Sequence, residues 1–230
     1  MTDVIAHRGA SRLERENTLD AFRRAHHLGA GWVELDVRRA ADGALVVHHD
    51  PHFVDGRAIA ATPGDRRPSN VPLLHEALAA CSGMQVNVEI KNSPDESGFD
   101  PDHAVVGPVV ALRADRGWTS RVLVSCFDRS TLDAVRAVDP ALATALLTSK
   151  VPIEVAERDE WLAGLAADGH RALHPWWPLV DADLVRAAHA AGLAVNVWTC
   201  DDPGAMVRLA GWGVDGICTN VPDVALAALA

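Results

Sequence analysis

The 230-residue sequence predicts an α/β protein folded as a (β/α)8 TIM barrel. Short apolar runs typical of buried strands alternate with helical patterns along the whole chain. Eight such pairs suit a compact barrel of this length, whereas an open doubly wound sheet usually has about five or six strands. The composition agrees with a folded protein that buries a sizeable core, since 49% of the residues are apolar and 23% are charged.

The expected elements follow one another in a regular order. The strand runs are V-I-A-H at 4–7, W-V-E-L-D-V at 32–37, V-N-V-E-I-K at 86–91, V-L-V-S-C at 122–126, T-A-L-L at 144–147, A-L-H at 172–174, A-V-N-V-W-T at 194–199 and G-I-C-T at 216–219. Apolar residues at helical spacing lie between and after these runs. They predict helices at 19–28, 73–80, 104–116, 130–138, 155–167, 182–191, 203–210 and 222–229.

The connection after the second strand is irregular. The chain passes through Ala41-Asp42-Gly43, a hairpin-type turn, into the apolar run A-L-V-V-H-H at 44–49, so we expect the second strand to fold back at the barrel mouth. Residues 50–71 then form the longest stretch with little periodicity, which makes them a candidate lid or substrate contact. We therefore predict a single domain over residues 1–230 with an insertion at about 41–71.

Charge and apolar patterning exclude several classes of partner. The 31 acidic and 21 basic residues give a net charge of −10, which disfavours binding to nucleic acid or to an anionic membrane surface. No apolar run approaches the roughly 20 residues of a membrane span, and the first residues lack the pattern of a signal peptide. We expect a cytoplasmic protein without stable membrane insertion. Its four cysteines, which form no C-x-x-C pair, are expected to be reduced packing residues.

Charged residues interrupt two of the predicted strands. Glu34 and Asp36 lie two positions apart and therefore share one face, as do Glu89 and Lys91. Carboxylates that face the axis of a barrel are costly to bury without a compensating charge. A hard divalent cation, Mg²⁺ or Ca²⁺, would provide it. The alternative is an ordinary ion-pair network in which basic residues neutralise the acids, the candidates being Lys91, Arg38 and Arg39.

Histidines from two segments are placed to join such a site. The first strand ends in His7-Arg8-Gly9, which brings an imidazole and a guanidinium to the barrel mouth. His48 and His49 lie in the expected hairpin and face opposite ways, so only one of them can reach the same centre, and the pattern alone does not choose. Two histidines, a cation site and basic groups are the parts needed for phosphodiester cleavage, with one imidazole accepting a proton and the other donating one.

Ordered motifs along the chain carry a family resemblance. They are I-A-H-R-G at 5–9, E-N-T at 16–18, E-L-D-V at 34–37, H-D at 49–50, V-E-I-K at 88–91, S-C-F at 125–127, N-V-W-T at 196–199 and G-V-D-G-I-C-T-N-V-P-D at 213–223. With these motifs the chain resembles the glycerophosphodiester phosphodiesterase family. The resemblance implies a barrel with a small insertion after the second strand, one divalent cation, Mg²⁺ or Ca²⁺, and hydrolysis of glycerophosphodiesters to glycerol 3-phosphate and an alcohol in lipid and glycerol metabolism.

The resemblance also implies roles for individual residues. The cation ligands match Glu34, Asp36 and Glu89, and the acid/base pair matches His7 and His49, which decides against His48. Arg8 and Lys91 match the basic residues that hold the phosphate. Separately, the spacing in N-V-W-T turns Trp198 toward the barrel axis, where it either walls the glycerol or fills the core. Asn17, three residues before Asp20, is interpreted as a cap of the first helix or as a catalytic residue.

Two alternative functions remain at this point. One is a phospholipase D-like hydrolase of lysophospholipids, which would use the same site with a more apolar mouth; the polar loop with Arg57, Asp65, Arg66 and Arg67 favours a soluble diester. The other is a non-catalytic barrel that binds phosphorylated ligands, which we would expect to lack a histidine or a carboxylate of the site. In each case the partner is a small molecule, and the protein is a monomer or a homodimer.

Overall fold

The computed structural model describes residues 1–115, 118, 120–152 and 154–230. Strands lie at β1 Asp3–His7, β2 Trp32–Arg39, β3 Leu45–Val47, β4 Gln85–Ile90, β5 Val122–Cys126, β6 Ala143–Thr148, β7 Ala172–Pro175, β8 Ala194–Val197 and β9 Gly216–Thr219. Helices lie at α1 Leu19–Leu28, α2 Leu74–Ala80, α3 Val106–Asp115, α4 Arg129–Val138, α5 Val155–Ala167, α6 Ala182–Ala190, α7 Pro203–Gly211 and α8 Pro222–Ala228. Short 3₁₀ turns are η1 Ile59–Ala61, η2 Gly64–Arg66 and η3 Trp177–Leu179.

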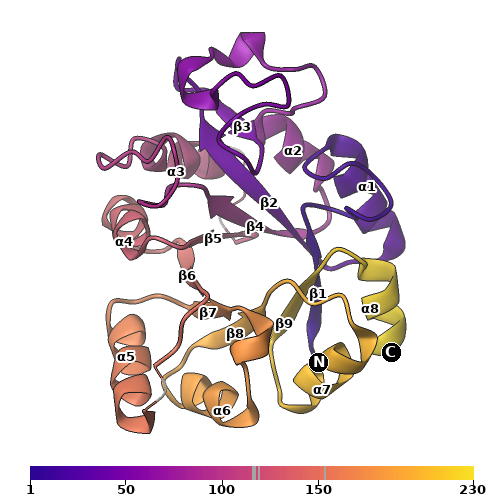
Figure 1. The fold of residues 1–230 in the computed structure, drawn as a ribbon, viewed down its shortest axis with the longest axis vertical. Helices are drawn as coiled ribbons and strands as arrows, with labels where there is room; N and C mark the ends of the chain where they lie inside the picture. Colours follow the sequence, from indigo (N-terminus) through magenta and orange to yellow (C-terminus); the bar gives the residue numbers. More distant parts are fainter. Residues whose placement is uncertain (116–117, 119, 153) are drawn as a thin grey trace.

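Eight of the strands close into a parallel barrel. They are hydrogen-bonded in the order β1-β9-β8-β7-β6-β5-β4-β2, and the pairing of β1 with β2 completes the ring. Helices surround the strands (Figure 1). The predicted (β/α)8 barrel is therefore confirmed, with most element boundaries within two residues of the expected ones. Arg116, the last residue of the predicted third helix, lies outside the described residues.

The alternation of residues in the strands explains the layers. In β2, Leu35 and Val37 are fully buried among the apolar residues of the main core, whereas Glu34 and Asp36 take the alternate positions. A separate small cluster at the amino ends of the strands joins Leu123, Ala145 and Ala172 with partly buried residues such as Trp32. Apolar side chains thus fill the amino end of the barrel, and the polar groups lie at the opposite, carboxyl end, where TIM-barrel active sites are found.

The predicted hairpin is present after β2. β3 runs antiparallel to β2, with Val37 opposite Val47. The segment that follows contains η1 and η2, and its residues Phe53, Ile59 and Val71 form a small core with Ala40 and Val46 of the hairpin. It projects from one side of the barrel above β2 (Figure 1). Among the described helices, none combines the length and the apolar character that a membrane crossing requires.

Candidate active site

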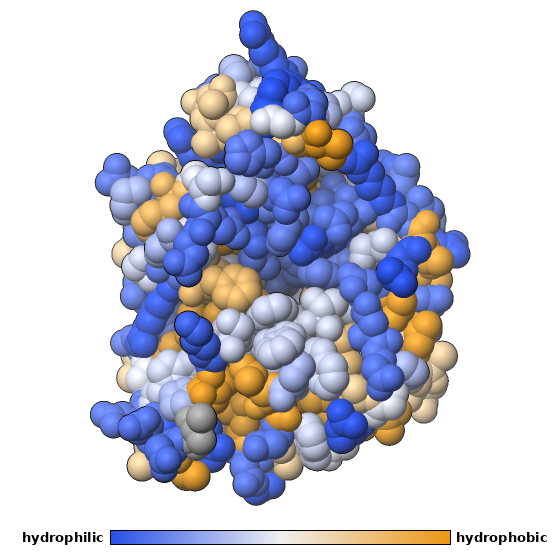
Figure 2. Space-filling model, viewed as in Figure 1, coloured by the Kyte–Doolittle hydropathy of each residue, from blue (hydrophilic) through white to orange (hydrophobic). Residues whose placement is uncertain are grey.

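A cavity of about 160 Å³ opens at the carboxyl ends of the barrel strands. Its charged side carries His7, Arg8, Glu34, His49, Glu89 and Lys91. Its apolar side carries Phe127, Leu147 and Trp198. Figure 2 shows the same division on the surface, with hydrophilic residues toward the insertion and paler or apolar ones toward β7 and β8. The predicted site residues are therefore gathered around one cavity, apart from Asp36, which is buried and does not line it.

The strand register brings three carboxylates together. His7 is opposite Glu34 in the β1–β2 pair, and Asp36 is opposite Glu89 in the β2–β4 pair. One carboxylate oxygen from each of the three acids lies within 4.8 Å of the others. Glu34 is 3% exposed, Asp36 1% and Glu89 9%, so all three are removed from bulk water. Such a cluster needs compensating positive charge.

Two basic residues supply part of that charge. The Arg8 Nε lies 3.2 Å from an oxygen of Asp36, and the Arg8 backbone N–H donates to Glu34 over 2.9 Å. Lys91 Nζ contacts Glu89 at 2.9 Å and Asp36 at 4.0 Å. The alternative of an ion-pair network is correct for Lys91, which contacts two of the three acids. It is wrong for Arg38 and Arg39, which contact none of the three. Three acids and two basic groups still leave one formal negative charge.

The residual charge appears in the pKa values and in unpaired oxygens. Burial, with repulsion from Asp36 and Glu89, raises the pKa of Glu34 well above its usual range. Burial and then Asp36 raise the pKa of Glu89 to about 7. Burial also opposes ionisation of Asp36, but Arg8 and Lys91 outweigh it and lower that pKa. Glu34 Oε1 and Asp36 Oδ1 are buried without a hydrogen-bond partner among the described residues. These properties fit a site for a divalent cation.

Asn17 belongs to this cluster, which corrects its interpretation as a helix cap. Its Nδ2 donates to Asp36 over 2.8 Å, and its Oδ1 accepts the Asp36 backbone N–H over 3.3 Å. Thr18 caps α1 instead, by accepting from Ala21 N–H. Asn17 has a positive φ of 56°, a conformation that Asn tolerates better than most residues. The E-N-T motif was the sequence signal for its place in the site.

The two predicted histidines face the cavity from different elements, His7 from the end of β1 and His49 from the loop after β3. His7 Nδ1 lies 2.7 Å from Asn220 Oδ1, and its Nε2 lies 3.9 Å from Glu34. Burial, followed by the charge of Arg8, lowers the pKa of His7. His49 is more exposed, and its Nδ1 lies 2.7 Å from the Asp50 carboxylate. His48 does not line this cavity, since its ring packs edge-on against Phe53 at a centroid distance of 5.6 Å.

Aromatic residues form the other wall. Trp198 donates its indole N–H to the backbone carbonyl of His174 over 2.7 Å, and Phe127 packs edge-on against Trp198 at 5.3 Å. β8 ends at Val197, two residues earlier than expected, because Trp198 continues only as an isolated bridge to Trp176. The sequence pattern did not single out His174. It is buried at the base of the cavity, accepts from Asn196, and burial lowers its pKa to about 3.

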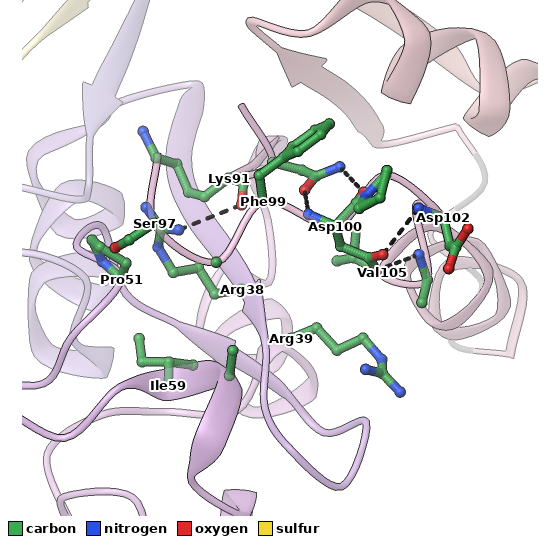
Figure 3. Close-up of a pocket in the computed structure, with 15 residues that line it drawn as sticks. Arg38, Arg39, Pro51, Ile59, Lys91, Ser97, Phe99, Asp100, Asp102 and Val105 are labelled. Atoms are coloured by element: carbon green, nitrogen blue, oxygen red, sulfur yellow. Dashed lines mark hydrogen bonds between the residues drawn. The ribbon is translucent and has the colours of Figure 1, made fainter. Parts of the chain in front are cut away.

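A second hollow, of about 460 Å³, lies beside the first, between the insertion and the loop after β4. Figure 3 shows Arg38 and Lys91 on one side of it and Phe99 and Asp100 on the other. Arg38 donates to the backbone carbonyl of His49 over 2.7 Å and reaches Lys91 O at 3.5 Å. It also pairs with Glu96 at 2.6 Å. Arg38 therefore ties the His49 loop to the strand end that carries Lys91.

Comparison with known proteins identifies the family of this chain. The profile of the Glycerophosphoryl diester phosphodiesterase family matches residues 7–60 and 56–224. A glycerophosphodiester phosphodiesterase from Caldanaerobacter subterraneus subsp. tengcongensis is 31% identical over 96% of this chain and 95% of its own length. An Oleispira antarctica phosphodiesterase, solved in complex with the product sn-glycerol-3-phosphate, superposes with a TM-score of 0.85 at 26% identity, covering 100% of this chain and 97% of that one.

A second solved structure has the same fold and a similar level of sequence identity. It is a putative glycerophosphoryl diester phosphodiesterase from Silicibacter pomeroyi, with a TM-score of 0.85 and 27% identity over 100% of this chain and 93% of its own. The sequence match, the fold and the gathered site residues lead to one assignment. The chain belongs to the glycerophosphoryl diester phosphodiesterase family.

Proposed function

We propose that this protein hydrolyses glycerophosphodiesters to glycerol 3-phosphate and an alcohol. The observation that carries the proposal is one cavity of about 160 Å³ that is lined by two imidazoles, two basic groups and the carboxylates of Glu34 and Glu89, with the Asp36 carboxylate clustered against these two. A volume of this size admits a small polar head group rather than a drug-sized ligand, for which roughly 300 Å³ or more is typical. The product bound to the Oleispira antarctica relative supports the same substrate class.

Glu34, Asp36 and Glu89 would hold one divalent cation, Mg²⁺ or Ca²⁺. When bound, such a cation supplies positive charge to the phosphoryl oxygens and lowers the pKa of a hydroxyl nucleophile. It would also change the formal charge of the group formed with Arg8 and Lys91 from one negative to one positive. A site with that charge complements a phosphodiester anion.

The remaining roles fall to side chains that line the cavity. Arg8 and Lys91 bind and orient the phosphate through charge-assisted hydrogen bonds. His7 and His49 act as the acid/base pair, in which one imidazole accepts the proton of the nucleophile and the other donates a proton to the leaving alcohol. Trp198 forms the apolar wall beside the glycerol carbons, held in place by its bond to His174.

The test uses metal-stripped protein and measures glycerol 3-phosphate and lysophosphatidic acid by mass spectrometry. Glycerophosphocholine, glycerophosphoethanolamine, glycerophosphoglycerol and lysophosphatidylcholine are each supplied with Mg²⁺, Ca²⁺ or Mn²⁺ added singly. We expect glycerol 3-phosphate from at least one glycerophosphodiester, and only when a cation is present. Cleavage of lysophosphatidylcholine alone would replace the proposal with the lipid-directed alternative. Saturable binding of glycerol 3-phosphate without any cleavage would replace it with the binding barrel.

A further inference from the structure

The side of His7 that faces away from the cavity is held by two residues with no assigned role. Asn220 follows β9, and its Oδ1 lies 2.7 Å from His7 Nδ1. Asp201 follows β8 and binds Asn220 twice, accepting its backbone N–H and its Nδ2 over 2.8 Å each. Thr219 donates a third hydrogen bond to Asp201 over 2.9 Å. A carboxylate, a carboxamide and an imidazole therefore form a chain that leads into the site.

The chemistry of Asp201 fixes the direction of every hydrogen bond in this chain. Burial opposes its ionisation, but hydrogen bonds from Asn220 and Thr219 lower its pKa, so it is a carboxylate with acceptor oxygens only. The amide of Asn220 must then turn its NH₂ toward Asp201 and its oxygen toward His7. An oxygen acceptor requires a proton on His7 Nδ1, which leaves the lone pair of the neutral ring on Nε2.

We propose that Asn220 and Asp201 are positioning residues that fix His7 as the Nδ1–H tautomer and thereby present its Nε2 to the phosphodiester. The inference rests on the proposed role of His7 in hydrolysis. Neither residue touches the cavity, so each acts through the imidazole. Ser11 also donates to Asn220 Oδ1 over 3.0 Å, and its hydroxyl can serve either orientation of that amide, so the orientation is set by Asp201.

One substitution should reverse the donors and acceptors in the hydrogen bonds from residue 201 through Asn220 to His7 without removing a side chain. In Asp201→Asn, the oxygen of the new amide stays with Thr219 and the Asn220 backbone, so its NH₂ faces Asn220. Asn220 must then flip and point its own NH₂ at His7. His7 becomes an acceptor at Nδ1 and carries its proton on Nε2. We expect kcat for the fastest glycerophosphodiester to fall about 10²-fold or more, with little change in KM, because the misplaced proton affects proton transfer rather than binding.

The double variant Asp201→Asn/Asn220→Asp should restore the original direction. The NH₂ of residue 201 then donates to a carboxylate at residue 220, whose second oxygen accepts from His7 Nδ1. We expect kcat to recover to within about tenfold of the wild type. The matched control is Asp202→Asn, which makes the same charge change one residue away. Asp202 caps α7 by accepting from Ala205 N–H, a role that Asn fills equally well, so activity should be unchanged.

The tautomer is measured directly by NMR of protein labelled with ¹⁵N-histidine in Mg²⁺, with the His7 signal assigned from His7→Gln. We expect a proton on Nδ1 in the wild type and in the double variant, and on Nε2 in folded Asp201→Asn. A proton on Nε2 in the wild type overturns the inference whether or not any variant folds. Wild-type kcat in folded Asp201→Asn, or no recovery in the folded double variant, also overturns it. A wild type that cleaves no glycerophosphodiester refutes the proposed function alone, since the tautomer is still measured.

Discussion

Replacing Glu89 with Gln should stabilise the metal-free protein at neutral pH. Glu89 is buried next to Asp36, and burial followed by this neighbour raises its pKa from 4.5 to about 7. In the unfolded chain the same carboxyl lies in water and keeps its ordinary pKa. Gln has nearly the shape of the protonated side chain and can still accept from Lys91, which also keeps Asp36 and Glu96 as partners at 4.0 and 3.5 Å.

The sign and size of the effect follow from the two pKa values. Below pH 4.5 the carboxyl of Glu89 is protonated in both states and has no effect on the free energy of unfolding. As the pH rises toward 7, the unfolded chain releases the proton while the folded chain retains it, so the metal-free wild type loses stability. The difference between these pKa values corresponds to roughly 3 kcal/mol once the pH exceeds both of them. The variant Glu89→Gln has no carboxyl at this position, so its free energy of unfolding does not fall in this way.

Urea unfolding in a chelator measures the effect at about pH 4 and pH 8, against wild type and against Glu160→Gln, a substitution on the exposed face of α5. We expect Glu89→Gln to match the wild type at the lower pH and to exceed it by about 1–3 kcal/mol at the higher one. Saturating Mg²⁺ or Ca²⁺ should reverse the order, because a ligand at a thousand times its Kd stabilises the wild type by about 4.1 kcal/mol. Lower stability of the variant in chelator at pH 8 would contradict the raised pKa of Glu89, and an equal gain of both proteins from the cation would contradict its role as a cation ligand.

Three further predictions concern the surroundings of the site. His49→Ala should lower kcat about 10²-fold or more, whereas His48→Ala, outside the cavity, should retain near-normal turnover; equal losses would contradict the assignment. Asn17→Ala removes both hydrogen bonds to Asp36 and should lower the free energy of unfolding in chelator by about 1–3 kcal/mol, which urea titration would detect. Arg38→Met frees the His49 loop and should reduce kcat about tenfold and speed hydrogen exchange at residues 49–60, and unchanged exchange would count against it.

The barrel was predictable because its signals are local. Apolar runs alternate with helical spacing, and the shared face of Glu34 and Asp36 follows from the period of a strand. Glu89 lies beside Asp36 because β2 and β4 are neighbouring strands and the two residues are paired in register. A barrel implies that these strands are neighbours, but it does not fix their register. The sequence therefore places the three carboxylates on neighbouring strands, and the structure supplies the register that brings them together.

The supporting residues were not accessible in the same way. Asn220 lies 213 positions from His7, and Arg38 reaches Glu96 across 58 positions. Neither pairing has a period or a spacing that marks it in the sequence. Asn17 matched a helix cap equally well, and only the turn with its positive φ sends its amide to Asp36 instead. Contacts of this kind depend on how loops from distant units meet at the barrel mouth.

The location of a bound cation shows whether the three buried carboxylates form the metal site next to the two imidazoles. Crystals grown with Mn²⁺ and glycerol 3-phosphate would reveal the ion by its anomalous scattering. We expect one peak bound by oxygens of Glu34, Asp36 and Glu89, with the phosphate between His7 and His49. A peak only at the second group of possible ligands, Asp133, Asp168 and His170, or a phosphate bound away from both imidazoles, would contradict it.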